Sequence, residues 1–156
     1  MVETMVMYIF LFLLTVVAME GVAFLMHKYL MHGPLWFIHE SHHRREKSRF
    51  EFNDLFGVFF AVPSIILIYL GTHGSPTLLA IGLGMTAYGA IYFGFHDVIV
   101  HHRIPHRIRP KGRYLQRIIK AHHIHHATRG KDGAVSFGFV YAPPIEKLTA
   151  ARSRQV

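Results

Sequence analysis

The sequence predicts an all-α membrane protein, with three to four transmembrane helices and cytoplasmic helical segments that carry clustered histidines. Two observations predict this class. Long apolar runs carry almost no charge, and histidines cluster after two of these runs. A soluble core of this size would alternate apolar and polar side chains, so the uninterrupted runs indicate lipid as their surroundings. The length suits one unit, and we expect a single membrane domain over residues 1–156.

Three apolar runs define the expected helices. The first extends from Thr4 to Met26, with Glu20 as its one charged residue. It is longer than the core of a typical signal peptide and lacks a basic leader, so we expect a retained helix. The second run extends from Leu55 to Leu70 and the third from Thr77 to Phe95. Gly and Pro in the segment 71–76 predict a tight polar turn between them.

Span parity and charge predict the topology. Three crossings place segments 27–54 and 96–156 on one side of the membrane and the turn 71–76 on the other. The turn is uncharged, whereas both segments are rich in Lys and Arg, and the first contains Lys28, Arg44, Arg45, Lys47 and Arg49. The positive-inside rule therefore predicts that both segments are cytoplasmic. It also explains the net charge of +8 without a nucleic-acid partner, and we expect none.

Ten of the fourteen histidines form two similar halves. Each half has an H-x4-H pair followed by an H-x-x-H-H triplet, and each begins at the end of an apolar run. The ten are His27, His32, His39, His42, His43, His96, His101, His122, His125 and His126. Residues i, i+3 and i+4 share one face of an α-helix, so each triplet can converge on one metal or bridge toward two. Positions i and i+5 lie about 140° apart on a regular helix, so each pair serves two different metals or the helix breaks.

Such a concentration of imidazoles predicts metal binding. Ten ligands are too many for one ion, and two ions with about five ligands each is the natural count. Imidazole suits iron, copper, zinc and nickel, so the ligand type does not name the metal. The absence of cysteine excludes iron–sulfur clusters and thiolate-ligated haem. His73, His102, His106 and His123 lie outside the repeated spacing, and we interpret His73 as a loop residue and the others as polar neighbours.

Three carboxylates are expected to accept hydrogen bonds from metal-binding histidines, as such groups commonly do. They are Glu20, seven residues before His27 in an apolar run, and Asp54 and Asp97 at the ends of runs. Asp54 has an alternative interpretation as the N-cap of the second span. Gly82, Thr86, Ala90 and Gly94 recur every fourth residue in the third run and predict close helix packing.

Several stretches resemble the fatty acid hydroxylase and sterol desaturase superfamily of histidine-box membrane enzymes, and more closely its bacterial β-carotene hydroxylases. They are HKYLMHG at 27–33, HESHH at 39–43, FNDLFGVFFA at 52–61, HDVIVHHR at 96–103 and AHHIHHATRGKDGAVSFGFVYAPP at 121–144. The histidine boxes mark the superfamily, and the VSFGFVYAPP and NDLF stretches favour the carotenoid branch. The resemblance extends over nearly the whole chain.

The resemblance implies an O2-dependent hydroxylase in a bacterial inner membrane, with two non-haem iron ions held by the ten histidines on the cytoplasmic side. The implied reaction hydroxylates C3 of each β-ionone ring, converting β-carotene through cryptoxanthin to zeaxanthin. The carotenoid would enter from the membrane lipids, and a ferredoxin-type donor would supply electrons.

Alternatives remain open from the residues alone. Another histidine-box lipid hydroxylase or desaturase, or a carotene ketolase, would have the same boxes. A membrane metal-binding protein or transporter would place its ligands along a path at the bilayer midplane. A bis-histidine haem protein would need only two to four of the histidines.

Overall fold

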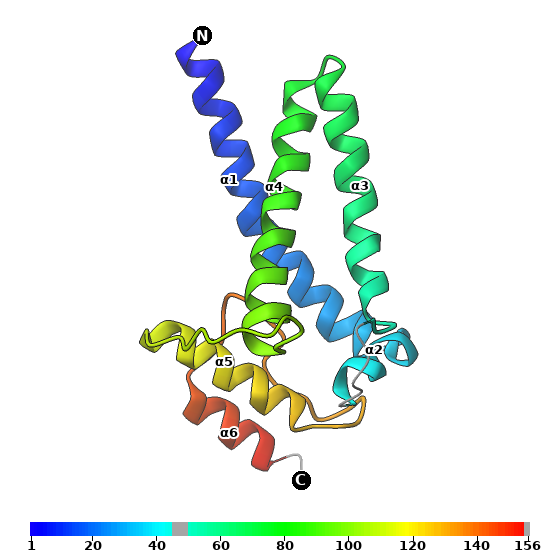
Figure 1. The fold of residues 1–156 in the computed structure, drawn as a ribbon, viewed down its shortest axis with the longest axis vertical. Coiled ribbons are helices and arrows are strands. Elements are labelled where there is room, and N and C mark those ends of the chain that lie inside the picture. The colour runs from blue at the N-terminus through cyan, green and yellow to red at the C-terminus, as the bar shows by residue number, and fades with distance from the viewer. Residues whose placement is uncertain (45–49, 155–156) are drawn as a thin grey trace.

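Three long helices form an upright bundle in the computed structural model, which describes residues 1–44 and 50–154. They are α1 (Val2–Leu25), α3 (Asp54–Thr72) and α4 (Pro76–Tyr92), shown in Figure 1. Each is long and apolar enough to cross a membrane, and most of each span faces outward rather than into the protein. The chain is therefore an integral membrane protein with three spans, and the described residues contain no strand.

The first and third spans continue past their α-helical parts as π-helix. Segment η1 (Met26–Met31) prolongs α1, and η2 (Phe93–Val100) prolongs α4. The backbone N–H of His32 donates to the carbonyl of His27 at 3.0 Å, and that of His101 donates to His96 at 2.9 Å. These are i to i+5 bonds, which define a π-helix. The histidine pairs therefore sit on a wider helical turn, which the sequence analysis did not anticipate.

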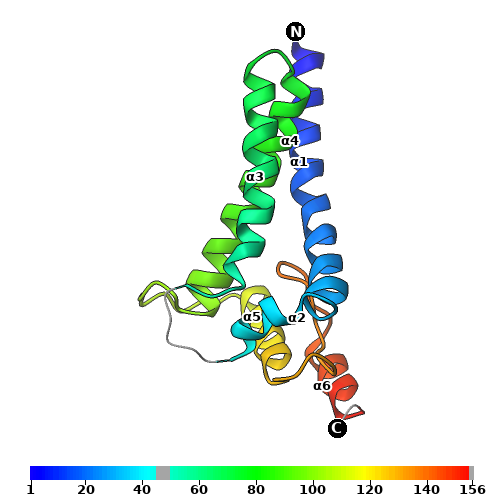
Figure 2. The same ribbon diagram turned by 90° about the vertical axis from the view of Figure 1, so that its right-hand side faces the viewer.

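Three shorter helices lie below the bundle, at the end opposite the N-terminus (Figures 1 and 2). They are α2 (Trp36–His43), α5 (Arg113–His126) and α6 (Ile145–Ser153). A small apolar core joins α5 to α6 through Ile118, Ala121 and Leu148. The two polar segments thus lie at one end of the bundle and the turn between α3 and α4 at the other, as span parity requires. Arg45, Lys47 and Arg49 of the topology prediction lie outside the described residues.

Glycines set how closely the spanning helices approach. A Cβ at Gly82 would lie 2.9 Å from the backbone nitrogen of Ile68, and one at Gly84 would lie 2.9 Å from the carbonyl oxygen of Phe12. The two glycines thus face different neighbours, α3 and α1. A Cβ at Gly94 would meet nothing within 4 Å, and Ala90 is exposed. The packing face predicted from the spacing of four residues is therefore correct for Gly82 and for Thr86, whose hydroxyl contacts Ser64 of α3, but wrong for Ala90 and Gly94.

Helix α4 is the centre of the bundle. It packs along both α3 and α1, whereas α1 and α3 lack comparable contact with each other among the described residues. Figure 2 shows α1 and α3 diverging toward the end where α2 and α5 lie. This divergence leaves room for a cavity directly above the histidine-bearing helices.

Candidate metal centre

The structure brings all ten histidines of the two repeats together in two groups of five. The first cluster contains His27, His32, His39, His43 and His125, and the second contains His42, His96, His101, His122 and His126. Within each cluster, the five ligand atoms lie within 4.8 Å of one another. All of these side chains are buried except His101 and His126, which are partly buried. The donor sets match the predicted count of about five imidazoles for each of two ions.

The local backbone explains how the spacing produces this division. On the π-helical turns, residues five apart share a face, so His27 and His32 enter the same cluster, as do His96 and His101. The first predicted alternative, in which the two histidines of an H-x4-H pair diverge, is therefore wrong. The second alternative, a helix break, is correct in position, because the two helical segments end at Met31 and Val100, just before the second histidine of each pair. Each H-x-x-H-H triplet lies on an α-helix and bridges the two clusters. His39 and His43 join the first cluster, while His42 between them joins the second.

The rings of the first cluster are all oriented by oxygen acceptors. Every Nδ1 atom donates to one: His27 to the Phe137 carbonyl, His32 to that of Lys131 and His39 to the Asn53 side-chain oxygen. His43 donates to the carbonyl of Thr128, and His125 to that of Val135. These donor–acceptor distances are 2.7–3.1 Å. Because a carbonyl oxygen can only accept, each neutral ring carries its proton on Nδ1.

This arrangement leaves the Nε2 lone pairs facing one another. Nε2 of His27 lies 3.1 Å from that of His39, and Nε2 of His125 lies 3.2 Å from those of His32 and His43. No proton remains to bridge these nitrogens, so their lone pairs repel unless a cation lies among them. Five buried nitrogen donors suit a transition-metal ion rather than Mg²⁺ or Ca²⁺, which prefer oxygen. The residues present therefore fit a metal.

The second cluster is backed by carboxylates. His42 donates from Nδ1 to Glu51 at 3.0 Å, and His96 donates to Asp97 at 2.8 Å. The Nε2 atoms of His42 and His96 then face each other at 3.1 Å, and Nε2 of His126 is buried without a hydrogen-bond partner. A carboxylate partner makes an imidazole a stronger metal donor than a carbonyl does. The two clusters therefore differ in the charge that surrounds them.

Burial keeps these rings neutral. Together with the neighbouring imidazoles, burial lowers the pKa of His39 to about 3 and the pKa values of His43 and His101 to about 4. The pKa values of His122 and His125 are held well below their usual range by the same two causes. Their lone pairs are therefore available to a metal at neutral pH.

Of the three carboxylates predicted to support histidines, Asp97 contacts one. Asp54 instead pairs with Arg103 through two hydrogen bonds of 2.6 and 2.7 Å, and it is the first residue of α3 rather than its N-cap. Arg103 also lies 3.7 Å from Asp97, which links this pair to the second cluster. Glu51 and Asn53, which do contact histidines, were missed by the sequence analysis. Both lie just before the second span and within four residues of Asp54. This closeness in sequence to a residue predicted to contact a histidine is the one signal that pointed to them.

Glu20 holds a loop rather than a histidine. Its Oε1 atom accepts the backbone N–H groups of Phe139, Val140 and Tyr141 at 2.9–3.1 Å, and its Oε2 atom accepts the hydroxyl of Tyr88 at 2.7 Å. Gly138 permits this approach, because a Cβ there would lie 2.9 Å from the Glu20 carboxylate. The partly buried carboxylate thus fixes the loop that presents Phe137 and Phe139 to His27.

The four histidines outside the repeats lie outside both clusters. His73 follows α3 at the opposite end and donates to the carbonyl of Tyr69. His102 and His106 stack on each other, and His106 also donates to the carbonyl of Val98. His123 is exposed on α5.

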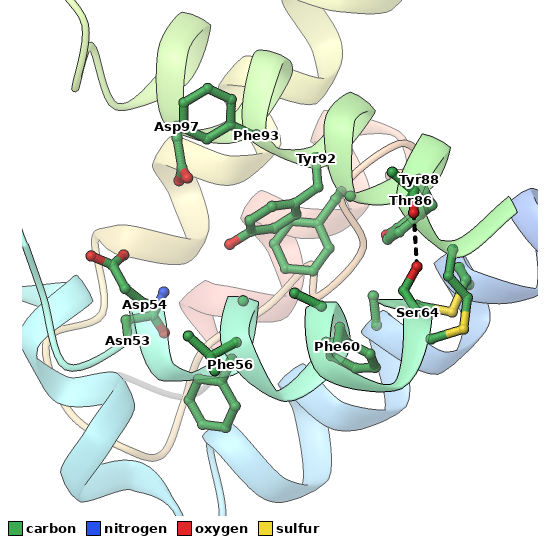
Figure 3. Close-up of a pocket in the computed structure, with 18 of the residues that line it drawn as sticks. Asn53, Asp54, Phe56, Phe60, Ser64, Thr86, Tyr88, Tyr92, Phe93 and Asp97 are labelled. Atoms are coloured by element: carbon green, nitrogen blue, oxygen red, sulfur yellow. Dashed lines mark hydrogen bonds between the residues drawn. The ribbon is translucent and has the colours of Figure 1, made fainter. Parts of the chain in front are cut away.

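An apolar cavity of about 1040 Å³ lies between the clusters and the interior of the bundle. Its wall includes Asn53 and Asp97, the hydrogen-bond partners of His39 and His96. Tyr92 and Phe139 also line it, and their rings stack on His96 and His27 at centroid distances of 4.5 and 5.1 Å. In Figure 3, the Tyr92 hydroxyl points toward the end of the cavity that holds Asp54 and Asp97. The rings of Tyr92 and Phe139 therefore separate the cavity from His96 and His27, one histidine of each cluster.

Comparisons with known proteins identify hydroxylases that are similar in sequence over most of the chain. The profile of the fatty acid hydroxylase family matches residues 12–148. The chain is 57% identical over 136 residues to a β-carotene hydroxylase of Pantoea ananas, covering 87% of this chain and 78% of the relative. It is 50% identical over 135 residues to a β-carotene hydroxylase of Paracoccus sp. (strain PC1), covering 86% of this chain and 83% of the relative. A chloroplastic β-carotene 3-hydroxylase of Arabidopsis thaliana is 37% identical over 131 residues, which are 81% of this chain and 43% of the relative. No solved structure matches the chain.

Proposed function

This chain belongs to the fatty acid hydroxylase family, and we propose that it is a β-carotene 3-hydroxylase with a pair of iron ions bound by the ten histidines. The observation that carries the proposal is an apolar cavity whose wall includes direct neighbours of both five-histidine clusters, in a chain 50–57% identical to bacterial β-carotene hydroxylases. The clustered histidines come from positions spread over residues 27–126, and this spread supports a single hydroxylase domain over the whole chain.

The chain's own residues orient the ligands and exclude water. Bound iron would supply the activation of O2 that places one oxygen atom on C3 of the ring and releases the other as water. Carbonyls and carboxylates hold each oriented imidazole with its lone pair toward its cluster. Tyr92 and Phe139 cover the clusters on the cavity side, so a carotenoid ring meets an apolar surface. The charged side chains of Asp54 and Arg103 reach the cavity, where they form an ion pair and neutralise each other's charge.

The reaction consumes two electrons that an external donor must deliver. Exposed Arg107, Arg109, Arg113 and Lys120 lie on α5 and the segment before it, at the end of the bundle that holds the clusters. This surface suits a small acidic ferredoxin. By the positive-inside rule, we place the clusters on the cytoplasmic side of a bacterial inner membrane.

Pigment analysis tests the proposed function. The chain is expressed in β-carotene-producing bacteria with a ferredoxin system, and pigments are separated by chromatography. Cryptoxanthin and zeaxanthin are the expected products, and His73→Ala should give the same pigments because His73 lies at the opposite end of the bundle. Unchanged β-carotene beside membrane-inserted protein would refute the assignment and favour a lipid hydroxylase or desaturase. A keto product would identify a carotene ketolase.

A further inference from the structure

The cavity is a groove with a defined length. Along α3 its lining residues extend from Asn53, beside the first cluster, to Ile65. Twelve residues of α-helix correspond to about 18 Å. At Ser64 the groove meets the contact between α3 and α4, because the Ser64 hydroxyl lies 2.8 Å from both the Gly82 carbonyl and the Thr86 hydroxyl (Figure 3). The reacting end of a ligand must therefore lie at the Asn53 end.

Two glycines in the groove wall have no packing role in the bundle. A Cβ placed on Gly57 of α3 or on Gly89 of α4 would meet nothing within 4 Å, and both residues line the groove. They differ from Gly82 and Gly84, where a Cβ would press against neighbouring backbone at 2.9 Å. Helix packing therefore explains Gly82 and Gly84 but not Gly57 and Gly89.

Both glycines lie close to the histidine end of the groove. Gly57 is one helical turn beyond Asn53, which corresponds to about 6 Å. Gly89 precedes His96 by seven residues, which corresponds to about 10 Å of helix. Around them the wall is formed by large side chains, including Phe56, Phe60 and Met85. The absence of side chains at these two positions widens the groove where the reacting group of a substrate would sit.

We propose that Gly57 and Gly89 determine substrate specificity by making the groove wide enough for the cyclic end group of a carotene. The inference rests on the proposed function, which supplies the carotene as occupant. A six-membered ring with methyl substituents is wider than the open-chain end of an acyclic carotene, so it alone needs the added width. A Leu at either position would place four carbon atoms in the space beside the ring.

Carotene binding tests this proposal separately from catalysis. Wild type, Gly57→Leu and Gly89→Leu are purified in lipid nanodiscs and titrated with β-carotene and with lycopene, an acyclic carotene of the same carbon number. Both variants should bind β-carotene at least tenfold more weakly and lycopene as wild type does, with unchanged metal content. Gly21→Leu is the matched control, because Gly21 is an exposed glycine of α1 with equal room for a Cβ but lies outside the groove wall. It should leave β-carotene binding unchanged.

Each result decides the question. Unchanged β-carotene binding in both Leu variants would overturn the proposal, and so would equal loss of both carotenes in well-folded protein. If the Leu variants do not fold, Gly57→Ala and Gly89→Ala replace them, and a selective loss of β-carotene over lycopene supports the proposal while no selectivity overturns it. Wild-type protein that binds β-carotene selectively but does not hydroxylate it would refute the proposed function and leave the groove inference standing.

Discussion

His42 and His96 face each other through their Nε2 atoms at 3.1 Å, although 54 residues separate them. His42 lies on α2 after the first span, and His96 lies on the π-helical end of the third. Their Nδ1 atoms donate to Glu51 and Asp97, so neither Nε2 has a proton for the other. Two buried lone pairs at this distance are a costly arrangement that a bound cation would relieve.

Substitution of one histidine in either cluster should release metal. His39→Ala and His42→Ala each remove one donor from a set of five and leave its neighbours misplaced. Loss of a supporting partner alone typically costs 10–100-fold, so we expect at least that loss in iron affinity and in product. Iron per protein and hydroxylated pigment are measured together. His123→Ala is the control because His123 is exposed on α5. Two irons per chain in His39→Ala would contradict its assignment as a ligand.

The carboxylate behind His42 should matter without binding metal itself. Glu51→Gln removes the negative charge that His42 faces, and it should lower iron affinity or activity about 10–100-fold. Glu40→Gln is the matched control, since Glu40 pairs with Arg44 in a partly exposed i, i+4 bridge. Equal effects of the two variants, measured by iron retention during dialysis against a chelator, would argue against the role of Glu51.

Glu20 should act on loop stability rather than on metal affinity directly. Glu20→Ala removes the carboxylate that accepts hydrogen bonds from three backbone N–H groups and from the Tyr88 hydroxyl. We expect a loss on the order of 3 kcal/mol in loop stability, because four donors, most of them partly buried, lose their acceptor together. Limited proteolysis near residues 137–141 should become faster, while Glu3→Ala, in the exposed first turn of α1, should not change it. A proteolysis rate equal to that of wild type would refute this account.

The topology can be checked with single cysteines because the native chain has none. Ser75 precedes α4 in the turn at one end of the bundle, and Ser153 ends α6 at the other. A membrane-impermeant thiol reagent should label Ser75→Cys only from outside the cell and Ser153→Cys only from the cytoplasmic side. Labelling of both from the same side would contradict the placement.

Iron retention should change little between pH 8 and 5.5. Protons and metal compete for the same Nε2 lone pairs, and burial lowers the pKa of His39 to about 3 and that of His43 to about 4. Ordinary histidines, with a pKa near 6.5, would already lose metal across this interval. The same lowered pKa values affect the stability of the metal-free fold. Below about pH 6.5 the unfolded chain binds more protons than the folded chain, so the free energy of unfolding of the metal-free protein decreases as the pH falls toward 4. Iron retained after equilibration at each pH gives the test, and half-loss near pH 6.5 would contradict the prediction.

The spans and the ten histidines could be predicted because their signals are local. An uncharged run reveals its lipid surroundings within about 20 residues. The repeated histidine spacing reveals a shared site without any knowledge of the backbone. The packing prediction for the third span failed at Ala90 and Gly94 for a corresponding reason. Periodicity describes one helix, whereas α4 meets α3 at Gly82 and α1 at Gly84.

The membrane class, the parity that gathers both histidine-bearing segments at one end and the set of ten imidazoles all follow from the residues in order along the chain. The division of these imidazoles into five and five depends on how the chain folds in space. The π-helical bonds at His32 and His101 rotate each pair onto one face, and no spacing rule reveals them. The acceptors behind the rings were equally hidden, since the Phe137 carbonyl reaches His27 from 110 residues away. A carbonyl exists at every residue, so its use as an acceptor depends on where the folded chain places it.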